Sequence, residues 1–183
     1  MSGRFLAVLF VGALVGCSRP TAEEYYKRAK EAELTAQKGL DTVQNAQEMV
    51  KLFQPAIDNY ANLVAEYPAS ELAESALFSL ATIRTNGTHE PQAAIDAYRR
   101  YVERYPAGNK APVCLFMIGY LYNNELHNFD SAAVAYKRFL AAYPRDEMAM
   151  SAQFELDNLG KPPEQILPAP APPNLTDRRR THR

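Results

Sequence analysis

The chain has 183 residues, of which 47% are apolar, with 20 Lys and Arg against 21 Asp and Glu. This length and apolar content suffice for one packed domain once a leader is set aside. Residues 17–160 carry 14 basic against 19 acidic residues, so the body is mildly acidic and shows no nucleic-acid surface; no nucleic-acid partner is expected.

The N-terminal segment has the layout of a secretory signal. Arg4 precedes an apolar run from Phe5 to Val15, and small residues follow. The run is shorter than the roughly 20 apolar residues that a membrane-spanning helix needs. We therefore predict a signal peptide over residues 1–16. The alternatives are an ordinary signal with an incidental cysteine and a short core helix.

The four residues Leu14 to Cys17 resemble the lipobox of bacterial lipoproteins. The resemblance implies that Cys17 is acylated through its sulfur and becomes the mature N-terminus. Each buried CH2 contributes about 0.8 kcal/mol, so several acyl chains anchor a protein firmly. Residues 17–20 would form the lipidated N-terminus and a short tether. Ser18 after the cysteine implies the periplasmic face of the outer membrane.

The second cysteine, Cys114, has no intramolecular partner if Cys17 carries lipid. It lies in the apolar run VCLFMIGYLY, where a free cysteine serves as a small buried hydrophobe. A catalytic nucleophile is the alternative, but no histidine or acidic residue is spaced to activate the thiol.

Three segments of the chain end alike, in AIDNYANLVAEYP, AIDAYRRYVERYP and AAVAYKRFLAAYP. Their prolines, Pro68, Pro106 and Pro144, are 38 residues apart. Alignment places small and aromatic residues at i, i+4, i+7 and i+11, which is one face of a helix. Each segment is therefore predicted to be an amphipathic helix that ends before its proline.

The intervening segments keep the same offset of 38 residues. Phe78, Phe116 and Phe154 align, and Ala81 matches Gly119. Glycine costs a helix about 1 kcal/mol relative to alanine, so Gly119 is expected to allow close approach of a neighbouring helix.

This pattern resembles the tetratricopeptide repeat, whose helices carry L-G-x2-Y and A-x3-F/Y-x2-aromatic-x4-P. The third repeat matches closely, with Gly119, Tyr122, Tyr136, Phe139 and Pro144. The resemblance implies an all-α tetratricopeptide-repeat solenoid over residues 21–160, with about three helix-turn-helix repeats and a C-terminal capping helix. The YP endings and long period look most like lipoproteins of the BamD type and the Tol-Pal accessory protein CpoB.

The first repeat is irregular. Thr21 and Glu24 have capping-box spacing. Residues 38–52 are interpreted as an insertion, partly helical and interrupted by Gly39, with the second helix starting near Phe53. The residues beyond the usual period of 34 are expected to enlarge the turns TNGTHEP and NNELHNFD.

Residues with catalytic chemistry are sparse. His89, His127 and His182 are isolated, and none has a second ligand at metal spacing, so they are read as turn or tail residues. The sequence has no phosphate loop, H-E-x-x-H helix or serine elbow. No enzyme, cofactor or metal is expected.

Binding is the better supported role, because stacked helix pairs create a concave surface lined by their first helices. By resemblance to the repeat family, the partner-binding groove is expected to contain Phe78, Thr82, Thr85, Asn86, Phe116, Tyr120, Asn123 and Asn124. These rings and amides suit an extended or helical segment of a partner protein. The alternative is that Phe78 and Phe116 only pack between repeats.

Residues 161–183 form a proline-rich basic tail that is expected to be extended and mobile. Its RRRTHR end could bind anionic lipid, cell-wall polymer or an acidic partner, or stay solvated. The leading interpretation of the whole chain is a lipid-anchored envelope scaffold that recruits another protein, in outer-membrane protein assembly or envelope maintenance. A structural, self-associating repeat module is the alternative; the sequence leaves the oligomeric state open.

Overall fold

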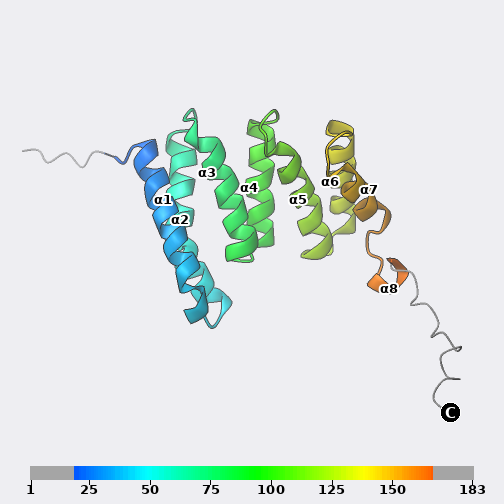
Figure 1. Ribbon diagram of the computed structural model, residues 1–183, viewed down its shortest axis with the longest axis horizontal. Coiled ribbons are helices and arrows are strands. Elements are labelled where there is room, and N and C mark those ends of the chain that lie inside the picture. The colour runs from blue at the N-terminus through cyan, green and yellow to red at the C-terminus, as the bar shows by residue number, and fades with distance from the viewer. Residues whose placement is uncertain (1–18, 167–183) are drawn as a thin grey trace, which may run out of the picture.

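The computed structural model describes residues 19–166, which fold into helices joined by short turns (Figure 1). The helices are α1 (Ala22–Gly39), α2 (Ala46–Glu66), α3 (Leu72–Thr82), α4 (Pro91–Arg104), α5 (Ala111–Asn124), α6 (Phe129–Ala142), α7 (Ala149–Asp157) and α8 (Pro163–Ile166). No strand occurs within this range. The predicted signal peptide, Cys17 and the tail from residue 167 onward lie outside the described residues.

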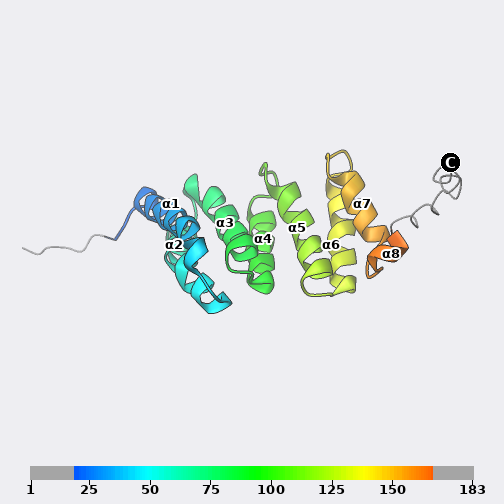
Figure 2. The same ribbon diagram turned by 60° about the horizontal axis from the view of Figure 1, so that its bottom comes forward.

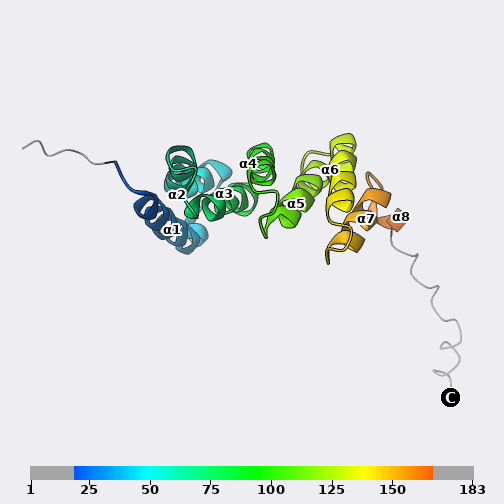
Figure 3. The same cartoon turned by 90° about the horizontal axis from the view of Figure 1, so that it is seen from above.

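The helices form two layers. Seen from above, α1, α3, α5 and α7 lie on one side of the stack and α2, α4 and α6 on the other (Figure 3). Each helix contacts the next one along the chain, from α1 with α2 to α6 with α7. The predicted all-α stack of three helix pairs and a further helix is therefore confirmed. Across residues 19–166 no helix is both long and apolar enough to cross a membrane.

The tyrosine before each repeat-ending proline is the C-cap residue of its helix. The backbone N–H groups of Tyr67, Tyr105 and Tyr143 donate to the carbonyls four residues earlier, at 2.9, 2.7 and 2.8 Å. Two of the rings also reach back one repeat, because the Tyr67 hydroxyl donates to the Pro20 carbonyl and the Tyr143 hydroxyl to that of Pro106. The YP endings thus join consecutive turns as well as ending the helices.

The expectation that the second helix starts near Phe53 is wrong. α2 begins seven residues earlier, at Ala46, where the Asn45 side chain accepts from the Glu48 backbone N–H at 3.0 Å. Glu48 in turn accepts from the backbone N–H of Gln44 at 2.9 Å. α2 continues through Pro55, which supplies no backbone N–H, as far as Glu66. By contrast, the Thr21 and Glu24 capping box at the start of α1 is present as predicted.

The two enlarged turns are built in the same way. In one, the backbone N–H of Thr88 donates to Ile83 and that of Glu90 to Arg84; in the other, Leu126 donates to Leu121 and Asn128 to Tyr122. Each turn places a histidine in the left-handed region, His89 at φ 52° and His127 at φ 50°. The first turn follows a π turn over Ile83–Gly87 that extends α3.

Aromatic residues of the second helices fill the space between the layers. Tyr60, Tyr101, Tyr136 and Phe139 are fully buried. Gly119 on α5 faces Tyr136, and a Cβ atom added there would lie 2.7 Å from Tyr136 Cε1. The expected packing role of Gly119 is therefore confirmed. In α7 the equivalent position is Asp157, which is exposed like Gln153 one turn earlier.

The tail departs from the predicted extended form at its start. Pro163–Ile166 form one helical turn, α8, which lies at the end of the stack next to α7 (Figure 2). Proline is favourable in the first turn of a helix, because the N–H group that it lacks has no helical acceptor there.

The Tyr136 hydroxyl is buried and has no hydrogen-bond partner among the described residues, whereas the Tyr60 hydroxyl donates to Glu33 at 2.8 Å. A buried polar group without a partner costs about 1–3 kcal/mol. Tyr136→Phe is therefore expected to raise the free energy of unfolding by about 1 kcal/mol. Tyr60→Phe is the matched control and is expected to lower it. Urea unfolding followed by circular dichroism measures both, and a Tyr136→Phe loss as large as that of Tyr60→Phe would contradict this account.

Candidate functional site

A hollow of about 390 Å³ lies between α3 and α5, near the C-terminal ends of both helices. We call it the central hollow. Its lining residues are Thr85, Asn86, His89, Pro91, Phe116, Met117, Tyr120, Leu121 and Glu125. Its walls therefore combine aromatic and apolar surface with a few polar groups, which is the usual make-up of a binding site.

A second hollow, of about 450 Å³, repeats this site between α5 and α7. We call it the C-terminal hollow. Seven of its lining residues stand 38 positions after residues of the central hollow: Asn123, Asn124, His127, Phe129, Phe154, Glu155 and Asn158 follow Thr85, Asn86, His89, Pro91, Phe116, Met117 and Tyr120. The solenoid thus offers the same site twice in succession.

A third hollow, of about 210 Å³, occupies the equivalent place between α1 and α3. We call it the N-terminal hollow. Thr82 and Ile83 line it, 38 positions before Tyr120 and Leu121 of the central hollow. The three hollows therefore form a row along the layer of first helices, and we call this row the groove.

The structure distributes the predicted groove residues over this row. Four of them line the central hollow: Thr85, Asn86, Phe116 and Tyr120. Asn123 and Asn124 line the C-terminal hollow, while Thr82 lines the N-terminal hollow. Phe78 lines none of the three.

The two phenylalanines differ in their surroundings. Phe78 packs edge-on against Tyr98 and Tyr101 of the following helix, with ring centroids 6.4 and 6.1 Å away. Phe116 packs in the same way against Tyr136 and Phe139, at 5.6 and 6.1 Å, and also faces the central hollow. Packing within the repeat therefore accounts for Phe78, and Phe116 combines packing with exposure to the groove.

Several polar groups of the groove already have partners in the chain. The hydroxyls of Thr82 and Thr85 donate to the helix carbonyls of Phe78 and Ala81, both at 3.0 Å. The amide nitrogen of Asn123 donates to Glu155 at 3.3 Å, and that of Asn124 donates to the Tyr120 carbonyl at 3.1 Å. Asn86 is exposed between the N-terminal and central hollows, which both include it in their walls.

The charge of the groove is mainly negative. Glu33, Glu125 and Glu155 line the three hollows, one in each, and Lys161 is the one Lys or Arg among their lining residues. A basic or uncharged segment is therefore favoured over an acidic one.

Some groove residues were not predicted from the sequence. The unpredicted lining residues include His89, His127, Phe129 and Phe154. The offset of 38 residues is the sequence signal that identifies them. His127 is equivalent to His89, Phe129 to Pro91 and Phe154 to Phe116.

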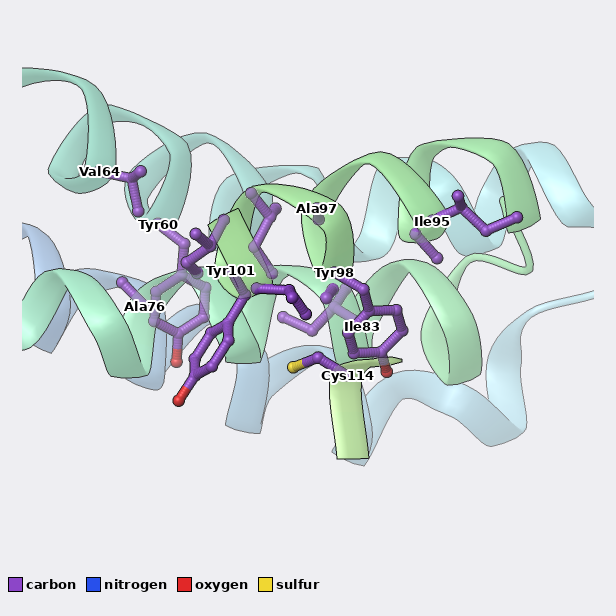
Figure 4. Close-up of a cluster of buried hydrophobic side chains, with 14 of the residues drawn as sticks. Tyr60, Val64, Ala76, Ile83, Ile95, Ala97, Tyr98, Tyr101 and Cys114 are labelled. Carbon is purple, nitrogen blue, oxygen red and sulfur yellow. The ribbon is translucent and has the colours of Figure 1, made fainter. Parts of the chain in front are cut away.

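The remaining cysteine belongs to the core. Cys114 is buried on α5, and Figure 4 shows it beside Tyr98 and Tyr101 of α4. Burial raises the pKa of the Cys114 thiol to about 12, so the thiol is protonated at neutral pH and is a poor nucleophile. Within residues 19–166 no group of three or more His, Cys, Asp or Glu side chains is placed to hold a metal ion.

The fold and the repeated hollows define a class of helical-repeat proteins. A family model described as the tetratricopeptide repeat matches residues 75–107 and residues 113–146. These stretches are the second and third helix pairs, so the stack is a tetratricopeptide-repeat solenoid, as the sequence predicted. A comparison with curated proteins finds no match for the chain.

Proposed function

We propose that the protein is an adaptor that binds a segment of another protein in the groove. The observation that carries this proposal is the repetition of one hollow along the first-helix layer, with Phe116 in the central hollow and Phe154 in the C-terminal hollow. Sites that repeat at a fixed spacing can bind successive parts of one extended polymer. Tetratricopeptide repeats typically bind polypeptides, so the polymer proposed here is a protein segment.

The groove favours a particular kind of segment. Tyr120 is 37% exposed and offers an apolar ring, while Glu125 and Glu155 favour basic side chains. A segment with apolar or aromatic anchors and basic residues between them would satisfy both features. The proposal includes no catalytic step. Cys114 is the only cysteine in the described range, and its high pKa disfavours the thiolate that a nucleophile would need.

The proposed place of action is the cell envelope. The lipobox-like residues Leu14 to Cys17 support a lipid anchor at Cys17, and the short tether up to residue 20 would hold the body near the membrane, since α1 has its N-cap at Thr21. We propose an adaptor at the periplasmic face of the outer membrane, in protein assembly or envelope maintenance. This part of the proposal rests on the N-terminal sequence.

The test is chemical crosslinking of the full-length chain in the membranes of a Gram-negative host, followed by quantitative mass spectrometry. The double variant Asn86→Ala, Tyr120→Ser is expected to lower recovery of a bound partner at least about tenfold, which corresponds to 1.4 kcal/mol. Both side chains are exposed in the central hollow, so the fold should persist.

The matched control is Val134→Ser. Val134 is 68% exposed on α6, outside the three hollows, so this variant removes exposed apolar surface away from the groove. Equal recovery from the groove variant and the wild type would contradict the adaptor function. The N-terminal mass of the same preparation tests the anchor separately: an unmodified Cys17 would remove the anchor from the proposal.

A further inference from the structure

The C-terminal hollow suits a proline-rich segment. Phe129 and Phe154 supply aromatic walls, and Asn124 and Asn158 supply amide groups. Grooves with aromatic walls bind polyproline II segments, whose stiff backbone loses little entropy and leaves its carbonyl groups open to hydrogen bonds.

The chain itself delivers such a segment to this place. Pro162 and Ile166 are lining residues of the C-terminal hollow, and Ile166 is the last residue that the structure describes. The sequence continues as LPAPAPPNL, which carries four prolines in nine residues. The tail therefore leaves the described fold directly at an aromatic hollow.

Within residues 19–166 no helix equivalent to α2, α4 and α6 follows α7 to cover Phe154. A fourth second helix would begin at residue 167, 38 positions after Phe129. The prolines at this point are incompatible with a helix interior. Phe78 and Phe116 are each covered by two aromatic rings, whereas Phe154 is 54% exposed in the described part of the chain.

The charges of the tail and the groove are complementary. Residues 167–183 carry four arginines against one aspartate. The central hollow carries Glu125 and no lysine or arginine, whereas Glu33 of the N-terminal hollow already pairs with Lys30 at 3.0 Å. In polyproline form, at 3.1 Å per residue, the 17 residues span about 50 Å, which is ample for a return along neighbouring repeats.

We propose that residues 167–183 fold back along the groove, with the proline-rich part in the C-terminal and central hollows and Arg178 to Arg180 near Glu125. The tail is then an intramolecular ligand, and a partner must displace it. The displacement step rests on the proposed function, but occupancy of the groove by the tail is independent of any partner.

The test is site-specific photocrosslinking in the full-length chain, with p-benzoylphenylalanine in place of Ala171. Irradiation is expected to join position 171 to peptides that contain Phe116 to Glu125 or Phe154 to Lys161 of the same molecule. Tyr120→Ser and Phe154→Ser are each expected to reduce this product at least about fivefold, since both rings are partly exposed and their loss leaves the core intact. Val134→Ser, on α6, is expected to leave it unchanged.

Three results would overturn the proposal. The first is crosslinking spread over the whole molecule or directed to α2, α4 and α6. The second is a product of the predicted kind whose yield falls equally with Val134→Ser. The third is crosslinking between two molecules, seen as dimers, which would contradict an intramolecular ligand. Equal partner recovery from the groove variant and the wild type in the membrane experiment, with the intramolecular crosslink of the wild type intact, would contradict the adaptor function alone.

Discussion

Gly119→Val is expected to destabilise the protein by at least about 3 kcal/mol, because the side chain enters a fully packed site. A Cβ atom at Gly119 would lie 2.7 to 2.9 Å from three carbons of the Tyr136 ring, which is fully buried. The ring cannot move away without displacing α6. Urea unfolding followed by circular dichroism is the measurement, and the midpoint should fall strongly with little change in slope.

A double-mutant cycle separates the clash from helix propensity. Gly119→Ala gains about 1 kcal/mol of helix propensity yet still brings a Cβ atom against the ring. In a Tyr136→Leu background that contact is relieved, so Gly119→Ala should become stabilising. If Gly119→Ala has the same effect in both backgrounds, Tyr136 is not the cause of the constraint.

Raising the pH above 10 is expected to unfold the solenoid cooperatively. Burial raises the pKa values of Tyr60, Tyr101 and Tyr136 above the ordinary value of 10, so the folded state holds these protons after the unfolded state releases them. The stability that they contribute is complete below pH 10 and decreases as the pH rises. Each tyrosine removes about 1.4 kcal/mol per pH unit, so the three remove about 4 kcal/mol per unit, comparable to a domain's whole stability.

The check is a pH titration with two probes in one sample. Phenolate absorbance near 295 nm reports tyrosine ionisation, and circular dichroism at 222 nm reports helix. The exposed tyrosines should ionise first, and the buried ones only together with loss of helix. Ionisation of all 11 tyrosines near pH 10 with the helix signal intact would show that the aromatic core is open to water.

The sequence predicted those parts of the fold that repeat. The prolines at positions 68, 106 and 144 located the helix ends, because a missing N–H and a fixed φ act locally wherever the residue stands. The start of α2 was predicted seven residues too late, because residues 38–52 were interpreted as an insertion, whereas the Asn45 and Glu48 cap starts the helix at Ala46.

The candidate site was predicted less completely. First-helix positions such as Tyr120 were identified by resemblance, and the structure places Tyr120 in the central hollow. Phe78 was assigned to the groove on the same basis, yet its ring packs against Tyr98 and Tyr101. His89 and His127 line the groove from turns in which their backbone is left-handed. Hydrophobic periodicity does not detect such turns, so these two lining residues were not predicted.

Asp157 also has a consequence for open-ended assembly. It occupies the column in which Ala81 and Gly119 accept the next helix, and Gln153 occupies that of Leu77 and Leu115. A second molecule stacked here as one more repeat would bury the Asp157 carboxylate against an aromatic ring, and among the described residues its side-chain partner is the neutral amide of Gln153, at 2.9 Å, which leaves the buried charge uncompensated. Head-to-tail growth into filaments by this geometry is therefore disfavoured at this end, even at high local concentration of the protein.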